Sequence, residues 1–324
     1  MSREPAYQQH GFPNRRSFVA ISAATIAGTV VPDVQTALAA PKLTGVTFSF
    51  GTYGMKTMKL EAAIRTVAKI GYDGIEIAAV PDWDSAPQKM STVRRTKTRT
   101  LLSDLGLAVT ALMEHLAPSA DEQEHARQLD RLKRVAALGH DLSPGNPPLI
   151  QTVLGGGSWN DKQSLFLDRL GDWAKLGKQL ETVIAIKPHR GGALSKPSEA
   201  VWLIKQLKDT PWLRMVYDYS HYAFRGMPLA ETIKTALPYT AHIAIKDTVK
   251  TETGFRFVLP GESGGFDYPT LLKMFYAGGY RGDVCCEVSS MVWNKRGYDP
   301  LAAAKSCYAN ISPIFGQVDV PRRS

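Results

Sequence analysis

The sequence predicts a single (β/α)8 barrel, and three observations lead to this fold class. Short apolar segments alternate regularly with segments of helical spacing, a pattern typical of a parallel sheet covered by helices. The alternation produces eight strand–helix pairs in a chain of 324 residues, and barrels of this type usually need about 250. No Gly-rich dinucleotide fingerprint follows an early strand, which disfavours a doubly wound sheet.

The eight predicted strands are short runs rich in Val, Ile, Leu and Ala. They span Leu43–Phe50, Gly74–Ile77, Ala108–Met113, Leu149–Leu154, Thr182–Ile186, Leu213–Tyr217, His242–Ile245 and Val284–Val288. The predicted helices show apolar residues three and four apart, and several are followed by a glycine. They span Leu60–Ile70, Val93–Leu105, Asp121–Leu138, Lys162–Leu180, Pro197–Leu207, Leu229–Ala236, Tyr268–Ala277 and Pro300–Ile311.

The first forty residues differ from the rest and predict a cleavable export signal. Arg15-Arg16 precede a mildly apolar run, and Ala37-Leu38-Ala39 supplies the small residues of a cleavage site. This resembles a twin-arginine signal at residues 1–40, followed by the barrel at residues 41–324. We therefore expect a periplasmic or extracellular protein. The apolar run is shorter than the roughly 20 residues of a membrane span, so no stable membrane association is expected. A disordered basic tail is the alternative.

Composition and charge disfavour a nucleic-acid-binding protein and a protein built on disulfides or a zinc cluster. The chain is 44% hydrophobic and 21% charged, as in globular proteins, and its net charge is +9. The densest basic run, residues 94–99, lies in a predicted helix and is interpreted as a solvated face, so no nucleic-acid partner is predicted. Cys285, Cys286 and Cys307 have no disulfide or zinc spacing and are expected to be buried thiols.

Polar residues gather where the predicted strands end, and the active site of such a barrel lies at these carboxyl ends. The set comprises Glu76, Glu114, His115, Lys187, His189, Arg190, Asp218, His221, Lys246, Asp247 and Glu287, with His242 near a strand start. Carboxylates, imidazoles and amines at one mouth suit proton transfer next to a carbonyl or alcohol, with or without a metal. Glu76 as a partner of an internal cation, His242 as a core histidine and Asp247 as a loop cap remain structural alternatives.

Five segments in the same order resemble the xylose isomerase-like barrels, a group that includes sugar phosphate isomerases/epimerases, ketose 3-epimerases, inosose dehydratases and endonuclease IV. These segments are Gly71–Glu76, Tyr217–His221, His242–Asp247, Pro260–Tyr268 and Gly278–Glu287. The resemblance implies a TIM barrel and a small-molecule carbohydrate substrate. It also implies an isomerase or epimerase that transfers a proton next to a carbonyl.

The resemblance further implies a metal site with four ligands, but only two of them are present. Asp218 and Glu287 match the aspartate and the last glutamate of the family's ligand set, whereas Lys187 and Ala244 stand at the glutamate and histidine positions. A lysine ammonium has no lone pair for a cation and repels one nearby.

Three hypotheses follow for the site. In the first, Lys187 takes the place of the metal, and the enzyme is metal-independent. In the second, one divalent ion (Mn, Mg, Co or Zn) is bound by Asp218, Glu287 and His189, with His221 or His242 as a candidate fourth ligand. In the third, the barrel binds a sugar without catalysis. The catalytic set under the first two is Glu287, Lys187 and His189, and the substrate-binding set is His221, Glu76, His115, Lys246 and Arg190.

Other reactions compete with isomerisation. A lyase or dehydratase acting on a keto-sugar or inosose begins with the same proton abstraction, so it remains an alternative. An endonuclease IV-like activity is disfavoured, because a three-zinc site needs more histidine and carboxylate ligands than this chain supplies. A lysine of lowered pKa that forms a Schiff base is also disfavoured, since Asp218 is expected near Lys187.

Overall fold

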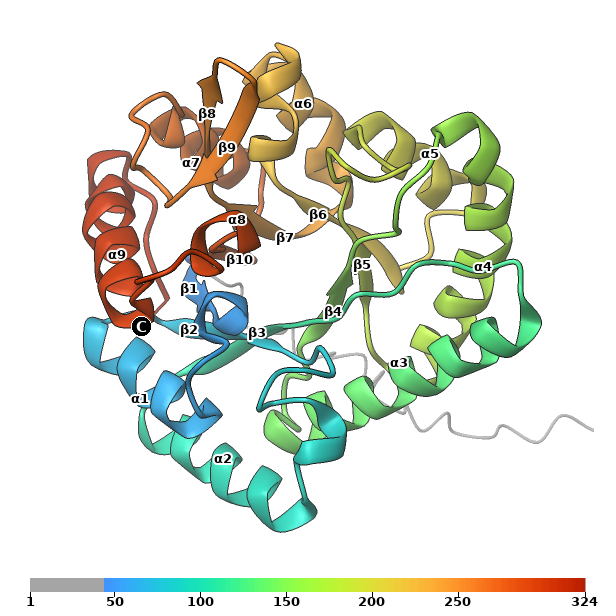
Figure 1. The fold of residues 1–324 in the computed structure, drawn as a ribbon, viewed down its shortest axis with the longest axis horizontal. Coiled ribbons are helices and arrows are strands. Elements are labelled where there is room, and N and C mark those ends of the chain that lie inside the picture. The colour runs from blue at the N-terminus through green and yellow to red at the C-terminus, as the bar shows by residue number, and fades with distance from the viewer. Residues whose placement is uncertain (1–43, 324) are drawn as a thin grey trace, which may run out of the picture. The chain divides into compact units, whose positions relative to one another are not determined.

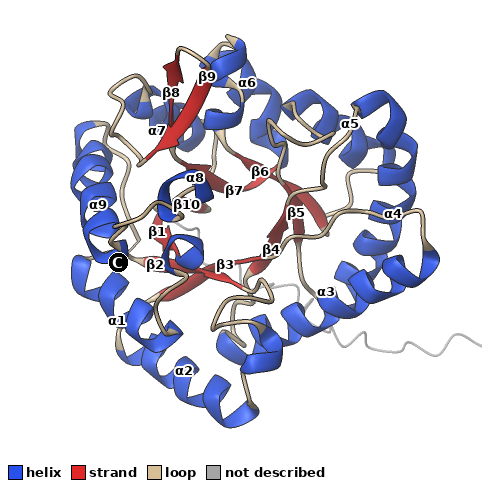
Figure 2. Cartoon of the chain, viewed as in Figure 1, coloured by secondary structure: helices blue, strands red, loops and turns tan. Residues whose placement is uncertain are grey.

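A closed barrel of eight parallel strands is the centre of the computed structural model, which describes residues 44–323 (Figures 1 and 2). The predicted export signal lies outside the described residues. The barrel strands are β1 (Thr47–Gly51), β2 (Gly74–Ala78), β3 (Ala108–Met113), β4 (Leu149–Thr152), β5 (Ile184–Ile186), β6 (Leu213–Tyr217), β7 (Thr240–Ile245) and β10 (Asp283–Cys286). Strand β10 pairs with both β7 and β1 and closes the barrel. The predicted (β/α)8 barrel is confirmed.

Helices surround the barrel on its outside (Figure 2). They are α1 (Leu60–Ile70), α2 (Thr92–Asp104), α3 (Glu122–Leu142), α4 (Trp159–Gln179), α5 (Pro197–Gln206), α6 (Leu229–Ala236), α7 (Tyr268–Ala277) and α9 (Pro300–Gln317). The side chains of Ser91, Asp121, Ser158 and Asp267 accept backbone N–H groups at the starts of four of them. Gly71 ends α1 with φ of 106°, a conformation that favours glycine. None of the described helices is long and apolar enough to cross a membrane.

Short elements at the carboxyl ends of the strands complete the mouth of the barrel. Four 3-10 turns lie here, Thr52–Met55, Pro87–Lys89, Tyr219–His221 and Ala223–Arg225, whereas a fifth, Leu237–Tyr239, precedes β7 at the opposite end of the barrel. Two further elements were not predicted: an antiparallel hairpin, β8 (Asp247–Thr251) with β9 (Gly254–Val258), and the short helix α8 (Ser290–Trp293). The hairpin strands are only partly buried and therefore carry few of the apolar residues that mark a strand in the sequence.

The core has two parts, and the inner part positions the site. Helices pack on the outer faces of the strands through one large apolar cluster. Inside the barrel, Ala185, Val216 and Ala244 form a small separate apolar layer, each two residues before a polar strand end. Cys285, Cys286 and Cys307 are buried free thiols, as predicted.

Candidate functional site

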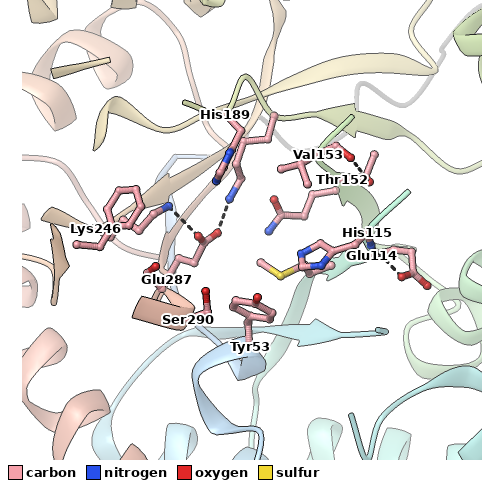
Figure 3. Close-up of a pocket in the computed structure, with 14 residues that line it drawn as sticks. Tyr53, Glu114, His115, Thr152, Val153, His189, Lys246, Glu287 and Ser290 are labelled. Atoms are coloured by element: carbon pink, nitrogen blue, oxygen red, sulfur yellow. Dashed lines mark hydrogen bonds and ion pairs between the residues drawn. The ribbon is translucent and has the colours of Figure 1, made fainter. Parts of the chain in front are cut away.

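A cavity of about 260 Å³ opens at the carboxyl ends of the strands (Figure 3). Its lining combines ionisable groups with an aromatic edge. The lining residues are Tyr53, Met113, Glu114, His115, Gln151, Thr152, Val153, Lys187, His189, Lys246, Phe257, Glu287, Ser289 and Ser290. Of the predicted site residues, the structure therefore brings Lys187, His189, His115, Lys246 and Glu287 to one cavity.

Four charged side chains form one buried group, which we call the lysine–carboxylate cluster: Lys187, Asp218, Lys246 and Glu287. Lys187 Nζ donates to Glu287 Oε2 and lies 3.8 Å from Asp218 Oδ2. Lys246 Nζ donates to Asp218 Oδ2 and, at 2.7 Å, to Glu287 Oε1. The remaining Asp218 oxygen accepts the Ser220 hydroxyl at 2.6 Å. Two ammonium groups thus neutralise two carboxylates.

The electrostatics of the lysine–carboxylate cluster hold all of these charges in place. Burial alone would raise the pKa of Glu287, but the ammonium groups of Lys187 and Lys246 outweigh burial and keep that pKa well below its usual range. The pKa of Asp218 is lowered in the same way. Burial alone would raise it, but the ammonium group of Lys246 outweighs burial. For Lys187, burial lowers the pKa, but Glu287 and Asp218 raise it above its ordinary value. Lys187 is therefore an ammonium, which excludes it as a Schiff-base nucleophile in this state.

Two histidines, His189 and His221, contact each other beside the cluster, with ring centroids 4.1 Å apart and the ring planes tilted by 49°. The backbone N–H of Gly191 donates to His189 Nδ1 at 3.2 Å, and that of Arg190 donates to His221 Nδ1 at 3.4 Å. Each ring therefore carries its proton on Nε2. Burial, reinforced by the neighbouring imidazole and lysines, lowers the pKa of His189 to about 3. Burial and Lys246 lower the pKa of His221 to about 4. Both rings are neutral at pH 7.

The two histidines differ in their access to the cavity. His189 lines the cavity, and its Nε2–H is free to donate. His221 does not line it, because it is buried behind His189 with its Nε2 3.3 Å from Asp218 Oδ2. In this structure the His221 ring therefore lies beside Asp218 and does not face the cavity.

The opposite wall carries His115 and Tyr53 (Figure 3). Burial lowers the pKa of His115, so this imidazole is also neutral at pH 7. Burial and nearby Glu287 raise the pKa of Tyr53, and its ring stacks on Trp83 with centroids 5.0 Å apart. Glu114 is held by the backbone N–H of His115 and by Arg131, so its carboxylate is engaged away from the lysine–carboxylate cluster.

Glu76 lies below the cavity, in a polar part of the barrel interior. It accepts a hydrogen bond from Gln151, which lines the cavity above it. Ligand atoms of Glu76, His242 and Cys285 lie within 4.8 Å of one another, so these three residues could together hold a metal ion. Burial lowers the pKa of His242, but the neighbouring Asp283, Cys285 and Glu76 outweigh burial and raise it. Burial raises the pKa of Cys285 to about 12. In this state His242 is an imidazolium paired with Glu76, and a metal would have to displace its proton.

Arg190 lies outside this cavity. Its guanidinium stacks on Phe255 and Phe224, on the other side of the loop that carries His189. Gln151 and Tyr53 are among the lining residues that were missed from the sequence. Gln151 is a polar residue within the apolar run Leu149–Leu154, and this signal could have identified it. Tyr53 follows β1 in a 3-10 turn and has no comparable signal.

Comparison with known proteins identifies the family. A sequence profile described as the xylose isomerase-like TIM barrel matches residues 64–306, most of the chain. The chain belongs to the xylose isomerase-like TIM barrel family. The resemblance seen in the five sequence segments is thereby confirmed. No curated protein matches the sequence.

Solved structures with the same fold include several enzymes. 3-Keto-D-glucoside 4-epimerase, YcjR, from E. coli is 16% identical, with a TM-score of 0.64 over 83% of this chain and 99% of that one. The probable 3-DHS dehydratase AsbF from Bacillus anthracis is 15% identical, with a TM-score of 0.66 over 82% and 98%. The IOLI protein, solved with a bound zinc atom, is 17% identical, with a TM-score of 0.70 over 84% and 99%. At these identities the likeness concerns the fold.

The lysine–carboxylate cluster does not fit the divalent ion that the family resemblance implies. Both Glu287 oxygens and Asp218 Oδ2 already accept from lysine ammonium groups. An ion between the two carboxylates would meet two positive charges with no additional anionic ligand. Among the described residues, His189 does not join Asp218 and Glu287 in a group of closely spaced ligand atoms.

Proposed function

We propose that this protein is a sugar isomerase or epimerase in which lysine replaces the catalytic metal of its family. The observation that carries the proposal is the ammonium group of Lys187. It lines the cavity, is buried beside Glu287 and Asp218, and remains charged. Proton loss from a carbon next to a carbonyl produces an enediolate, and a fixed positive charge beside the developing oxyanion lowers the barrier.

The two lysines differ in how many of their N–H groups are already used in hydrogen bonds, and this difference indicates their roles. An ammonium has three N–H donors. Lys246 uses two of them, on Asp218 and Glu287, and its Nζ faces the Phe257 ring at 5.3 Å. Lys187 makes one hydrogen bond, to Glu287, which leaves donors for a substrate oxygen. Lys187 is therefore the oxyanion donor, and Lys246 holds the two carboxylates in position.

Glu287 is the base in this proposal. It takes the proton from the carbon beside the carbonyl, and the electron pair of the C–H bond forms the enediolate. In isomerisation Glu287 returns the proton to the neighbouring carbon while a hydroxyl proton moves between the two substrate oxygens. In epimerisation a donor on the opposite wall, where Tyr53 and His115 lie, protonates the other face of the same carbon. Because both lysines depress the pKa of Glu287, the carboxylate is a weak base at rest. It becomes stronger when Lys187 turns toward the substrate oxyanion. His189 donates its Nε2–H to a second substrate oxygen.

Hydrogen exchange in D2O tests the proposal. The full chain, dialysed against EDTA, would be incubated with D-fructose, L-ribulose and a 3-keto-D-glucoside, chosen because epimerases of the same fold are described with such sugars. We expect deuterium at the carbon next to the carbonyl of at least one sugar by NMR, together with its epimer or isomer. Lys187→Met should lower the exchange rate by about 10²–10³-fold, as for loss of an oxyanion donor.

The same spectra discriminate between the competing functions. An unsaturated product formed with loss of water would identify a lyase or dehydratase. A sugar that raises the melting temperature of the protein without exchange would identify a non-catalytic sugar-binding barrel and overturn the proposal. Exchange that appears only after a divalent ion is restored would contradict the replacement of the metal by lysine.

A further inference from the structure

A second, larger cavity lies beside the first. It has a volume of about 900 Å³, toward the upper end of the 300–1,000 Å³ of ligand pockets. The hairpin β8–β9 forms one wall, and the segment after β6 forms another. Figure 1 shows this hairpin at the rim of the barrel, near α6 and α7, and β9 contacts α8. The residues that matter for its chemistry are Arg190, Lys250, Tyr219, Phe224, Phe255 and Phe266.

The two cavities share a wall. His189 lines the first, and Arg190, the next residue, lines the second. Phe257 lines the first and Phe255 the second, on the same face of β9, with ring centroids 5.5 Å apart. A molecule that reacts at Glu287 would therefore need only a short extension past His189 to reach the second cavity.

Arg190 is held as a recognition group rather than as a partner of a carboxylate. Its guanidinium lies 3.0 Å from the Phe255 ring centroid and 4.7 Å from that of Phe224. Stacking on aromatic faces fixes the plane of a guanidinium and leaves its N–H edge available. Within residues 44–323 Arg190 forms no ion pair, and its Nε is buried without a hydrogen-bond partner. The backbone oxygen of Arg190 accepts Arg225 Nη2 at 3.3 Å, which brings a second cation close.

The charge around the second cavity is positive and uncompensated. Arg190 and Lys250 line it, and none of its lining residues is acidic. Burial and the neighbouring Arg225 lower the pKa of Arg190, as expected for a cation without a counter-ion. Such a site favours an anion, and the planar fork of an arginine suits the paired oxygens of a carboxylate or phosphate.

We propose that the second cavity binds an anionic group, a carboxylate or phosphate, carried by the same sugar whose carbonyl end lies at Glu287. Arg190 contacts the anion, Lys250 adds attraction from the hairpin, and the aromatic side chains cover the carbon skeleton between the two ends. This inference rests on the proposed function, because it assigns the substrate class of that site.

Calorimetric titration with matched sugars tests the inference. The probes are D-glucose, D-glucuronate and D-glucose 6-phosphate, which differ in the anionic group. We expect at least one anionic sugar to bind about tenfold or more tightly than D-glucose, and the carboxylate and phosphate arms show which anion is preferred. Arg190→Gln should remove this preference, and Lys250→Gln should reduce it less, because Lys250 is exposed.

Arg256→Gln is the matched control. Arg256 lies on strand β9, next to the lining residue Phe255, but is itself exposed and outside the cavity lining, so the variant removes an equal charge close to the cavity. If Arg190→Gln and Arg256→Gln weaken anion binding equally, only the general field of the protein is responsible, and the site is refuted. The absence of any anion preference refutes it as well. Hydrogen exchange without anion preference rejects this site alone, whereas anion preference without hydrogen exchange rejects the proposed reaction and leaves the site.

Discussion

Replacing Lys187 with methionine tests the lysine–carboxylate cluster most directly. The side chains are of similar length, so the change removes a charge with little change in volume. In the native protein Lys187 Nζ contacts Glu287 and lies 3.8 Å from Asp218 Oδ2. The variant leaves two buried carboxylates sharing one ammonium, that of Lys246.

The expected decrease in the free energy of unfolding can be worked out from the distances between these charges. At an effective dielectric constant of about 20, charges 3.8 Å apart attract by about 4 kcal/mol, and the closer contact with Glu287 adds a similar amount. Part of this lost attraction is offset, because the variant also removes the repulsion between the two lysines and the cost of burying the Lys187 ammonium. Removing one partner of a buried pair usually costs about 3–5 kcal/mol, and we expect a decrease of that size in the free energy of unfolding at pH 7.

The pH dependence has a definite sign. The pKa values of Asp218 and Glu287 are depressed in the native fold, so their contribution is present above the unfolded values near 4 and is lost as the pH falls through the folded ones. In Lys187→Met the pKa of one carboxylate rises, so that carboxylate takes up a proton as the pH falls. The difference from wild type should shrink between pH 7 and pH 4, by at most about 1.4 kcal/mol per pH unit.

Urea unfolding followed by tryptophan fluorescence at pH 7, 5.5 and 4 measures both quantities. The double variant Lys187→Met/Glu287→Gln is the control, because it leaves Lys246 and Asp218 as a neutral pair. It should recover about 2 kcal/mol of the loss while remaining inactive. A single variant within about 1 kcal/mol of wild type at pH 7, or a loss that does not vary with pH, would refute a buried cluster of four charges.

Three further predictions concern other parts of the chain. Dialysis against EDTA should leave hydrogen exchange into the substrate undiminished, and a loss restored only by a divalent ion would argue for a metal at the site. Asp247→Asn should lower the free energy of unfolding by about 2–3 kcal/mol in urea titrations, since Asp247 accepts from Gly261 and Ser263 N–H groups and from the Tyr268 hydroxyl; an unchanged midpoint would count against that role. Arg15→Lys/Arg16→Lys should retain the protein in the cytoplasm, and N-terminal sequencing of the exported wild type should begin after Ala39 or Ala40.

The barrel could be predicted from the sequence because its elements follow local patterns. Helices α1, α6 and α7 begin and end where apolar spacing, proline and glycine indicate, and β3 and β6 match their predicted bounds. The hairpin β8–β9 could not be predicted in the same way. Its strands cover a cavity instead of a core, so their side chains carry little of the alternation that marks a buried strand.

The sequence could predict which residues lie at the strand ends of the candidate site, but not which of them contact one another. Charge at the end of an apolar strand requires a reason, and this argument singles out Lys187, Asp218 and Glu287. It cannot show that Lys246 bridges both carboxylates, or that His221 lies behind His189, because these contacts join separate strands. Arg190 belongs to the same loop as His189, but its side chain points to the second cavity. There its guanidinium packs on the rings of Phe224 and Phe255. Only the three-dimensional arrangement separates these neighbours.

Charge balance explains why a lysine can stand where the family keeps a metal-binding glutamate. In the implied family site, three carboxylates and a neighbouring lysine surround a divalent ion, and the charges cancel. Exchanging one of those glutamates for Lys187 changes the local charge by two units, which equals the charge of one divalent ion. Asp218 and Glu287 remain balanced by Lys187 and Lys246, all of them buried. Ala244 is compatible with the proposed replacement of the metal, because its methyl group joins Ala185 and Val216 in an apolar layer. Adding a divalent ion would leave two uncompensated positive charges in a buried site, a cost that no further ligand offsets.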